Sequence, residues 1–365
     1  VNHFFTTTEM LPQIKLDTID QKMGDSRFYF KNQTSFVQLD SKTGQPAATD
    51  PKGKKTQRVD TYNQFARQDK IGIFEFHPYV ATRQTYYSRD IGRQNTNLIR
   101  GIFYGGSDLS TKFYRLFEVE TNFANLDIHN IRHVITPTVS YAYIHPPTVV
   151  ASKLYPFDDV DTIDRKNQIT LSLENKLQTK RGGGSSVDLL RWLLSTDYIM
   201  KNKSGPGRFH NLKSDLEIKP YDWLSFYSDS DFDPKSGEFT SMNFDFAANG
   251  GDKWNIGLGQ RYQRDVVSQN TISNQTTVDA AYRINPKWKV RAYERFEFKT
   301  NTLKEQEYTI IRDLHCWTME MSYNSTAGEG NEIWLIFRIK AFPEMGFEFN
   351  NSYHRRKAGS QSSEE

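Results

Sequence analysis

The stretch EIWLIFRIKAF, residues 332–342, alternates between side chains of two kinds. Successive residues of a β-strand point to opposite faces, so a period of two sorts this stretch into two rows. One row holds Ile333, Leu335, Phe337 and Ile339, and the other holds Trp334, Ile336, Arg338 and Lys340. The stretch therefore predicts a strand with an apolar face and a charged face, as expected where two solvents meet.

The same alternation recurs along most of the chain. NQITLSLENKL (residues 167–177), NLKSDLEIKPYDW (211–223) and KWNIGLGQRY (253–262) all follow it. We count about sixteen such segments, many near the ten-residue length of a membrane-spanning strand. Convincing helical patterns are lacking. The sequence predicts an all-β protein.

The amino-acid composition argues against two classes of protein, those that bind nucleic acids and those that span a membrane with helices. The 365 residues carry 47 Lys and Arg against 44 Asp and Glu, a net charge of +3. This balance does not indicate a nucleic-acid partner. No apolar run approaches the roughly 20 residues of a membrane-spanning helix. Residue 1 is Val and no signal-sequence pattern follows it, so a mature piece or a fragment is expected.

The connections between predicted strands differ in length. Short turns are expected at residues 220–222, 249–253 and 285–287, and longer connections at 40–57, 146–166, 202–208, 232–238 and 264–275. Short turns on one side of a sheet and long loops on the other are typical of outer-membrane barrels. A soluble β-sandwich has no reason to sort its connections in this way.

Tryptophans lie near the predicted strand ends. They are Trp223, Trp254, Trp288, Trp317 and Trp334. Aromatic girdles occupy this position at the two interfaces of a membrane. The alternative interpretation is that these residues pack at the corners of a sheet.

The face opposite the apolar row is densely charged. We expect the following residues of this face to line a lumen: Lys213, Asp215, Glu217, Arg291, Arg295 and Arg338. Charged side chains would be crowded inside a small barrel, whereas a wide and hydrated interior accommodates them.

No pattern in the sequence indicates catalysis, a cofactor or a metal. The acidic stretch PFDDVDTIDRK, residues 156–166, lacks the glycine and the distal glutamate of a calcium-binding loop. We expect it to be a solvated external loop. The histidines are scattered without ligand spacing, and the sequence contains no phosphate loop or nucleophile elbow. The protein is not expected to be an enzyme.

Several segments resemble one known family. IRHVITPTVSYAYIHPP (residues 131–147), RKNQITLSLENKLQTKR (165–181), VDLLRWLLSTDY (187–198) and LHCWTMEMSY (314–323) resemble segments of LptD, the lipopolysaccharide (LPS) assembly proteins of the outer membrane. The matches follow the order of the family across nearly the whole chain.

The resemblance implies a fold and a function. Residues 1–342 would form the C-terminal part of a large antiparallel transmembrane β-barrel of the outer-membrane type, here incomplete with about sixteen strands, and residues 343–365 would form a tail. An N-terminal periplasmic jelly-roll domain and the first strands would be absent. The protein would translocate LPS through the barrel and a lateral seam into the outer leaflet of a Gram-negative outer membrane.

The resemblance also implies partners. These are LPS, an LptE-type lipoprotein plug, outer-membrane lipid, and the periplasmic Lpt bridge, which would be reached through the missing N-terminal domain. No nucleic acid is expected. The strand that closes the barrel at the seam would be residues 332–342, ended by Pro343, with Ile333, Leu335, Phe337 and Ile339 as candidate seam residues.

Cys316 is the only cysteine and lies in a predicted periplasmic turn. In the family, cysteines at this turn form disulfides to the N-terminal domain, so the resemblance implies a bridge from Cys316 to a cysteine outside this sequence. Better-studied family members carry two adjacent cysteines where this chain has Cys316 followed by Trp317. One bridge at most can form from this turn, and a free thiol is the alternative.

Two further functional hypotheses remain open. A diffusion porin or substrate-specific channel would share the barrel and the lumen, but has no reason to carry the ordered family segments or the cysteine turn. A soluble extracellular β-repeat protein would share only the strands, and membrane extraction would distinguish it.

Overall fold

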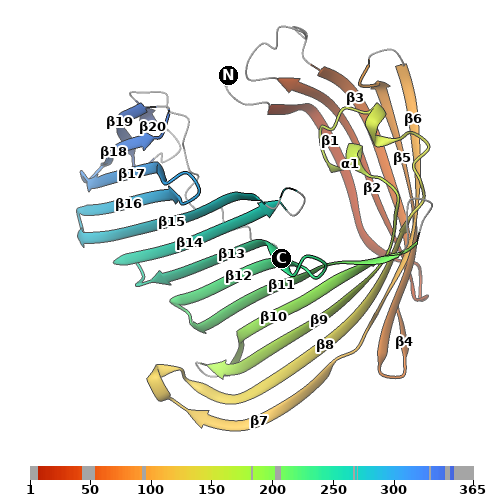
Figure 1. Ribbon diagram of the computed structural model, residues 1–365, viewed down its shortest axis with the longest axis horizontal. Helices are drawn as coiled ribbons and strands as arrows, with labels where there is room; N and C mark the ends of the chain where they lie inside the picture. The colour runs from red at the N-terminus through yellow and green to blue at the C-terminus, as the bar shows by residue number, and fades with distance from the viewer. Residues whose placement is uncertain are drawn as a thin grey trace. The chain divides into compact units, whose positions relative to one another are not determined.

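The computed structural model describes residues 7–42, 54–92, 96–181, 184–201, 207–265, 268, 270–328, 330–341 and 346–348. Twenty strands occupy most of these residues and belong to one antiparallel sheet (Figure 1). The all-β prediction is therefore confirmed. The predicted number of about sixteen strands was too low, partly because strands of three residues are too short to show alternation. No helix in the described residues is long and apolar enough to cross a membrane.

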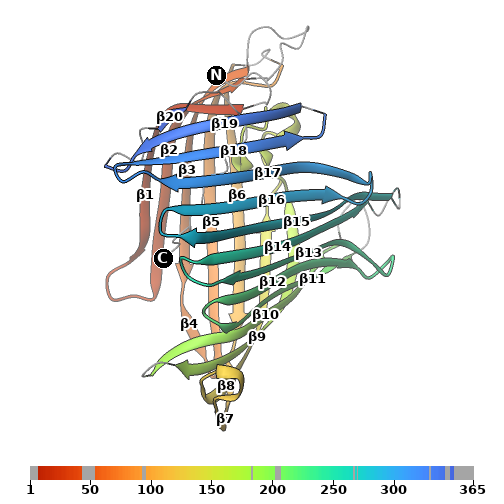
Figure 2. The same ribbon diagram turned by 90° about the vertical axis from the view of Figure 1, so that its left-hand side faces the viewer.

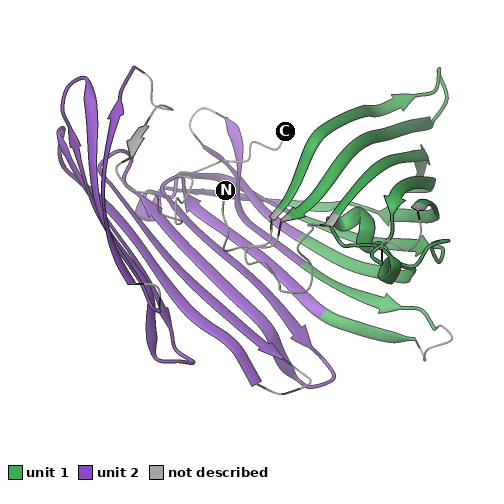
Figure 3. Cartoon of the chain, turned by 90° about the horizontal axis from the view of Figure 1, so that it is seen from above, with its two compact units in different colours: residues 1–115, 134–174, 194–211 green, residues 116–133, 175–193, 212–365 purple. Residues whose placement is uncertain are grey.

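The chain forms two compact units, shown in different colours in Figure 3. Unit 1 comprises residues 1–115, 134–174 and 194–211, and unit 2 comprises residues 116–133, 175–193 and 212–365. The strands that contribute to both units are β7 (Phe113–Thr121), β8 (Ile128–Ile144), β9 (Lys166–Arg181) and β10 (Ser185–Ile199). β11 (Arg208–Tyr221) follows them and also crosses the boundary.

Unit 1 is built on five long neighbouring strands and one short strand, β4. They are β1 (Thr7–Lys22), β2 (Phe28–Lys42), β3 (Lys54–Arg67), β4 (Asp69–Ile71), β5 (Phe74–Arg89) and β6 (Thr96–Ser110). Antiparallel pairing runs from β1 to β2, then to β3, β5 and β6. The faces alternate as a strand requires: Arg58 and Asp60 of β3 are buried, whereas Val59 between them is exposed.

Unit 2 is an antiparallel meander of shorter strands (Figure 2). They are β12 (Leu224–Asp233), β13 (Glu238–Asn249), β14 (Trp254–Asp265), β15 (Asn270–Asn285), β16 (Trp288–Glu297), β17 (Thr302–Asp313), β18 (Trp317–Thr326), β19 (Gly330–Ile339) and β20 (Gly346–Glu348). Each strand pairs with the next along the chain. Consecutive pairing of this kind needs only short connections.

The connections in unit 2 correct one prediction. β14 continues to Asp265 and β15 begins at Asn270, so the long connection predicted at residues 264–275 is mostly strand. Polar residues at the ends of both strands hid the continuing ladder, because they interrupt the apolar alternation. The predicted connection at residues 146–166 is long, as expected.

Four of the five predicted girdle tryptophans lie at one edge of unit 2. Trp254, Trp288 and Trp317 each begin a strand, and Trp223 immediately precedes β12. Trp334 was predicted wrongly. It is the fifth residue of β19, is only 5% exposed, and donates a hydrogen bond from Nε1 to Glu332 at 3.2 Å.

The predicted last strand is followed by another. β19 ends at Ile339, and three residues of β20 pair with Ile336, Phe337 and Arg338. Part of the predicted tail, residues 343–365, therefore extends the sheet. Pro343 lies outside the described residues.

Candidate functional site

The long connection between β8 and β9 folds back against unit 1. We call residues 145–165 the folded loop. It contains two short turns of helix, η2 (Ala151–Lys153) and α1 (Asp159–Thr162). Leu154 and Asp161 are buried, and Asp161 is only 1% exposed. The prediction of a solvated external loop was therefore wrong.

Backbone hydrogen bonds attach the first part of the folded loop to β6 and to the turn that follows β5. His145 N donates to Phe103 O at 2.9 Å, and Thr148 N donates to Gly101 O at 3.1 Å. Further along, Ile91 N donates to Lys153 O at 2.9 Å. The loop thus continues the hydrogen bonding of the sheet before it leaves it.

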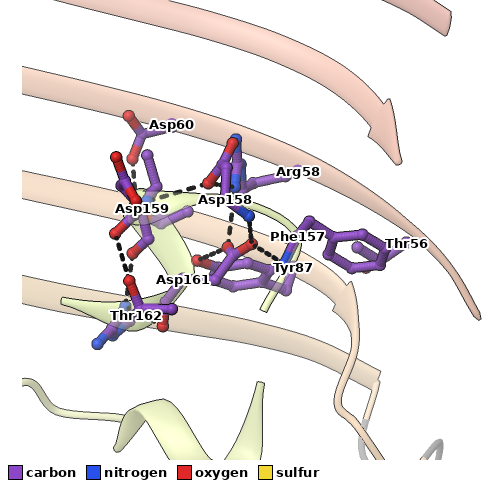
Figure 4. A network of polar contacts seen from close by, with 12 residues as sticks. Thr56, Arg58, Asp60, Tyr87, Phe157, Asp158, Asp159, Asp161 and Thr162 are labelled. Carbon is purple, nitrogen blue, oxygen red and sulfur yellow. Dashed lines mark hydrogen bonds and ion pairs between the residues drawn. The ribbon is translucent and has the colours of Figure 1, made fainter. Parts of the chain in front are cut away.

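Arg58 of β3 forms the centre of a buried polar network (Figure 4). Its guanidinium contacts Asp158 at 2.5 and 2.7 Å and Asp161 at 2.8 Å. Tyr87 of β5 donates a hydrogen bond to Asp161 at 2.8 Å. Arg58 is 3% exposed, so these contacts lie largely out of water, where unpaired charge is costly.

A second arginine, Arg100 of β6, binds the backbone of the folded loop. It donates to Val149 O and Val160 O, both at 2.9 Å, and also to the carbonyls of Asp161 and Ile163. The carbonyls at the end of α1 have no partner within the helix, so a planar guanidinium satisfies several of them together.

The aspartates of the folded loop also organise its own backbone. Asp158 caps α1 by accepting from Val160 N at 3.0 Å, and Asp161 accepts from Phe157 N and Asp158 N. Burial opposes ionisation of Asp158, but the hydrogen bond and the charge of Arg58 outweigh it and lower the pKa of this carboxyl. The loop therefore docks in its ionised form near neutral pH.

This network supports a structural role. Its arginines and aspartates satisfy one another, and no nucleophile with an adjacent base is present among its residues. Within the described residues, no group of three or more His, Cys, Asp or Glu side chains could hold a metal ion. The arrangement fastens a loop across the polar face of β3, β5 and β6.

Sequence reasoning missed Arg58, Tyr87 and Arg100. One signal was available: Asp158 and Asp161 stand three residues apart, the spacing of a helix-capping pair. That spacing predicts α1, but it does not predict which strand lies beneath the helix. These three partners are between 49 and 103 positions away from the loop residues that they contact, and only the tertiary fold brings them together.

The predicted lumen residues share one face of unit 2. Cross-strand register from β11 to β19 keeps them on the face opposite Ile256, Leu258 and Leu335. The three arginines form ion pairs with carboxylates: Arg291 with Asp279 at 2.8 Å, Arg295 with Glu305 at 3.3 Å, and Arg338 with Glu320. The two acidic residues also have partners, Asp215 with Arg191 at 3.4 Å and Glu217 with Lys219. Lys213 lies opposite Asp231 of the neighbouring strand β12. They therefore share one face, and the lining of a lumen by this face stays a prediction.

The predicted seam residues lie on the other face, on β19. Ile333 and Leu335 are exposed, and Phe337 and Ile339 continue the same row. β18 pairs with β19 along its whole length. On the opposite edge of β19, the described strands of unit 2 provide partners for only three residues.

Cys316 lies in the turn between β17 and β18, its side chain is exposed, and this chain has no second cysteine with which it could pair. Its Sγ is 3.2 Å from Nδ1 of His315, and its carbonyl accepts from Lys340 N at 3.0 Å. The turn lies at the same edge of unit 2 as the turn at Lys287, since Asp313 N donates to Lys287 O at 2.8 Å.

These features define a class of protein. The strands of unit 2 from β12 to β19 have 10 to 16 residues, with apolar side chains exposed on one face and charges on the other. This pattern is that of an outer-membrane β-barrel protein.

The family follows from the sequence. The family model described as LPS transport system D, LptD, matches residues 2–288, and the chain belongs to this family. The protein therefore acts in LPS assembly at the outer membrane of a Gram-negative bacterium, and it is a transport protein rather than an enzyme.

Other comparisons are more distant. A search of curated proteins finds no match. Among solved structures, a triple mutant of the Rh. blastica porin is 10% identical, with a TM-score of 0.32 over 80% of this chain and 93% of the porin. The FrpB iron transporter from Neisseria meningitidis is 10% identical, with a TM-score of 0.38 over 90% of this chain and 64% of that one. The alcaligin receptor FauA from Bordetella pertussis has a TM-score of 0.32 and 10% identity, over 92% of this chain and 70% of that one.

Proposed function

We propose that the protein delivers LPS through a polar interior and releases it sideways along the edge of β19. The observation that carries this proposal is the pairing of β19, which is complete towards β18 and, among the residues that the structure describes, extends to three residues towards β20. Unpaired backbone groups are costly in lipid, so a strand edge with few hydrogen bonds is the easiest place to open a sheet in a membrane.

The charged face of unit 2 supports the first part of this path. Arg291, Arg295 and Arg338 lie there with carboxylate partners. Such a surface can solvate the sugars and phosphates of LPS, which cannot cross hydrocarbon. The acyl chains would remain on the side of Ile333 and Leu335, where the sheet is apolar.

The proposal includes partners beyond this chain. Residues 1–342 would supply the C-terminal part of the barrel, and residues 343–365 a tail that contributes β20. An N-terminal jelly-roll domain would receive LPS from the periplasmic Lpt bridge, and an LptE-type lipoprotein would fill the lumen. The support is the family membership together with the exposure of Cys316, which leaves the thiol accessible for a bridge to such a domain.

The folded loop has a role in this proposal. It covers the polar face of β3, β5 and β6 and is fastened by Arg58 and Arg100. An open hydrated interior would admit small solutes, whereas a loop held across it obstructs them. We propose that the folded loop limits such leakage while LPS passes.

Site-specific photocrosslinking in cells tests the lateral path. A photoreactive residue at Ile333 of β19 is compared with one at Val278 of β15, since both positions are exposed on the apolar face. We expect LPS adducts to be enriched at Ile333 and this enrichment to disappear when LPS synthesis is stopped.

The same experiment separates the proposal from its alternative. A diffusion porin has no preferred point of LPS exit, so it would give equal adducts at Ile333 and Val278, independent of LPS synthesis. That result would contradict a lateral path at β19.

A further inference from the structure

An apolar groove of about 540 Å³ lies on unit 2, on the face away from the predicted lumen. It runs across β14, β15, β16 and β17, which lie side by side in Figure 2. Its floor is the cross-strand pair Ala280 and Ala292. Ile256 and Tyr308 flank this pair in the same row of the sheet.

The groove exists because small side chains replace large ones in this row. The next row towards the tryptophan edge contains Trp254, Tyr282, Val290 and Ile310. Two alanine methyl groups between Ile256 and Tyr308 leave a depression that bulky neighbours surround. In a membrane protein, such a depression takes an acyl chain, because an empty void loses the dispersion contacts of its lining.

A cation stands at the end of the groove. Arg312 pairs across the ladder with Trp288, one row beyond Val290 and Ile310, and its guanidinium lies 4.9 Å from the centre of the Trp288 ring. Arg312 is exposed, as is Lys287 in the adjoining turn. Within the described residues, neither side chain has an ion-pair partner.

The dimensions place the groove within one leaflet. Arg312 and Tyr308 are four residues apart on β17, which corresponds to about 13 Å along a strand. Half of a bilayer's hydrocarbon core is about 15 Å thick. A phosphate at Arg312 and a chain that reaches Tyr308 therefore match one lipid of the leaflet at the tryptophan edge.

We propose that this groove is a binding site for an anionic glycerophospholipid, with one acyl chain over Ala280 and Ala292 and the phosphate on Arg312. Arginine presents a planar fork that suits phosphate, and a second cation favours a headgroup with net negative charge. The long connections of the chain, residues 145–165 and 200–207, follow the opposite ends of these alternating strands, which assigns the tryptophan edge to the periplasmic leaflet, where phospholipid is found. The proposal needs only the outer-membrane location and is independent of the seam at β19.

Native mass spectrometry of the full chain in neutral detergent tests this site. The purified protein is incubated with phosphatidylglycerol, with zwitterionic phosphatidylcholine, or with LPS. We expect one retained phosphatidylglycerol. Arg312→Gln should weaken its binding roughly tenfold, which corresponds to about 1.4 kcal/mol. Ala292→Phe fills the groove and should abolish retention.

Two matched variants serve as controls. Val278→Phe adds the same ring to the same face beside the groove, and Lys289→Gln removes a cation from the opposite face beside Trp288. Both should retain phosphatidylglycerol. Arg312 is exposed, so its variant gives an answer even where Ala292→Phe does not fold. Equal retention of both phospholipids, preferential retention of LPS, or wild-type binding by Arg312→Gln would overturn the proposal.

Discussion

Arg58 shows how a single side chain can fasten a loop to a sheet. It joins β3 to two aspartates that follow it by about 100 residues, and Asp161 is completely covered. Loss of one member of a buried ion pair leaves the other charged and unpaired, which is more costly than loss of the attraction alone. The network is therefore sensitive to single substitutions.

We predict that Arg58→Ala releases the folded loop. Breaking a buried pair costs about 3–5 kcal/mol, because Asp161 would remain charged and out of water. Hydrogen–deuterium exchange of residues 151–164 in detergent should rise strongly, and cells should become permeable to large hydrophilic antibiotics.

Arg261→Ala is the matched control for Arg58→Ala. Arg261 also makes a two-oxygen contact, with Asp245 at 2.7 Å, but both side chains are 46% exposed. Exposed pairs contribute about 0–1 kcal/mol, so exchange should stay near the wild-type rate. Equal effects of the two variants would show that the Arg58 network does not hold the loop.

A pH dependence is also expected at the residue scale. The pKa of Asp158 is lower in the folded state than its ordinary value of 3.8, so the undocked loop binds the proton more readily. The stabilisation is complete above pH 3.8 and is lost as the pH falls through the folded-state pKa below it. Pepsin cleavage of residues 151–164, followed between pH 5 and 2, should begin only below about pH 3.8. Asp158→Asn should remove the step, and a step between about pH 4 and 5 would point to another group.

At the scale of elements, alternation in β19 determines which side chains meet lipid. Leu335 stands across from Met321 and lies on the exposed apolar face, whereas Arg338 faces the other way and pairs with Glu320. One residue of shift would exchange these faces, so the register has a direct energetic consequence.

We predict that Leu335→Arg destabilises the folded protein by about 2–4 kcal/mol, the cost of a charge near the membrane midplane. Arg338→Gln removes a charge from the opposite face and should cost about 0–1 kcal/mol. Denaturant titration of the protein refolded in liposomes measures both free energies of unfolding. Equal costs would contradict the assigned faces.

The strands were the part of the fold most open to sequence prediction. Alternation is clear in β14 from Trp254 to Gly259 and in the apolar row of β19 from Ile333 to Ile339, because each face contacts a different environment along the strand. Trp334 was misplaced since a short window cannot distinguish the centre of a strand from its end. The folded loop was misjudged because its aspartates are polar in any setting, and only the distant Arg58 makes them buried. The sequence on either side of the folded loop does not show that Arg58 will lie beside these aspartates.

At the scale of the whole molecule, Cys316 is the candidate for a covalent link between this chain and another domain. The thiol is exposed in a turn of the tryptophan edge, and the periplasm is oxidising. We predict a disulfide between Cys316 and a cysteine outside these 365 residues. Chain entropy would put its stabilisation near the upper end of the usual range, about 5 kcal/mol, because the closed loop is long.

Non-reducing gels of the natural full-length protein test the bridge. Its mobility should change on reduction, and a maleimide should label Cys316 only after reduction. Cys316→Ser should still reach the membrane but deliver LPS poorly, since the periplasmic domain would no longer be fixed to the barrel. Stoichiometric labelling without reduction would show a free thiol.

The network around Arg58 also constrains how this protein can change over evolutionary time. A mutation of Arg58 alone leaves the buried Asp161 without its ion-pair partner, and a mutation of Asp161 alone leaves Arg58 with one carboxylate fewer. Each single mutation therefore gives a less stable protein. Related proteins should therefore either keep the arginine and both aspartates or have lost all three together. The residues at positions 58, 158 and 161 would then covary in an alignment of related sequences, whereas the other positions of the folded loop would vary independently.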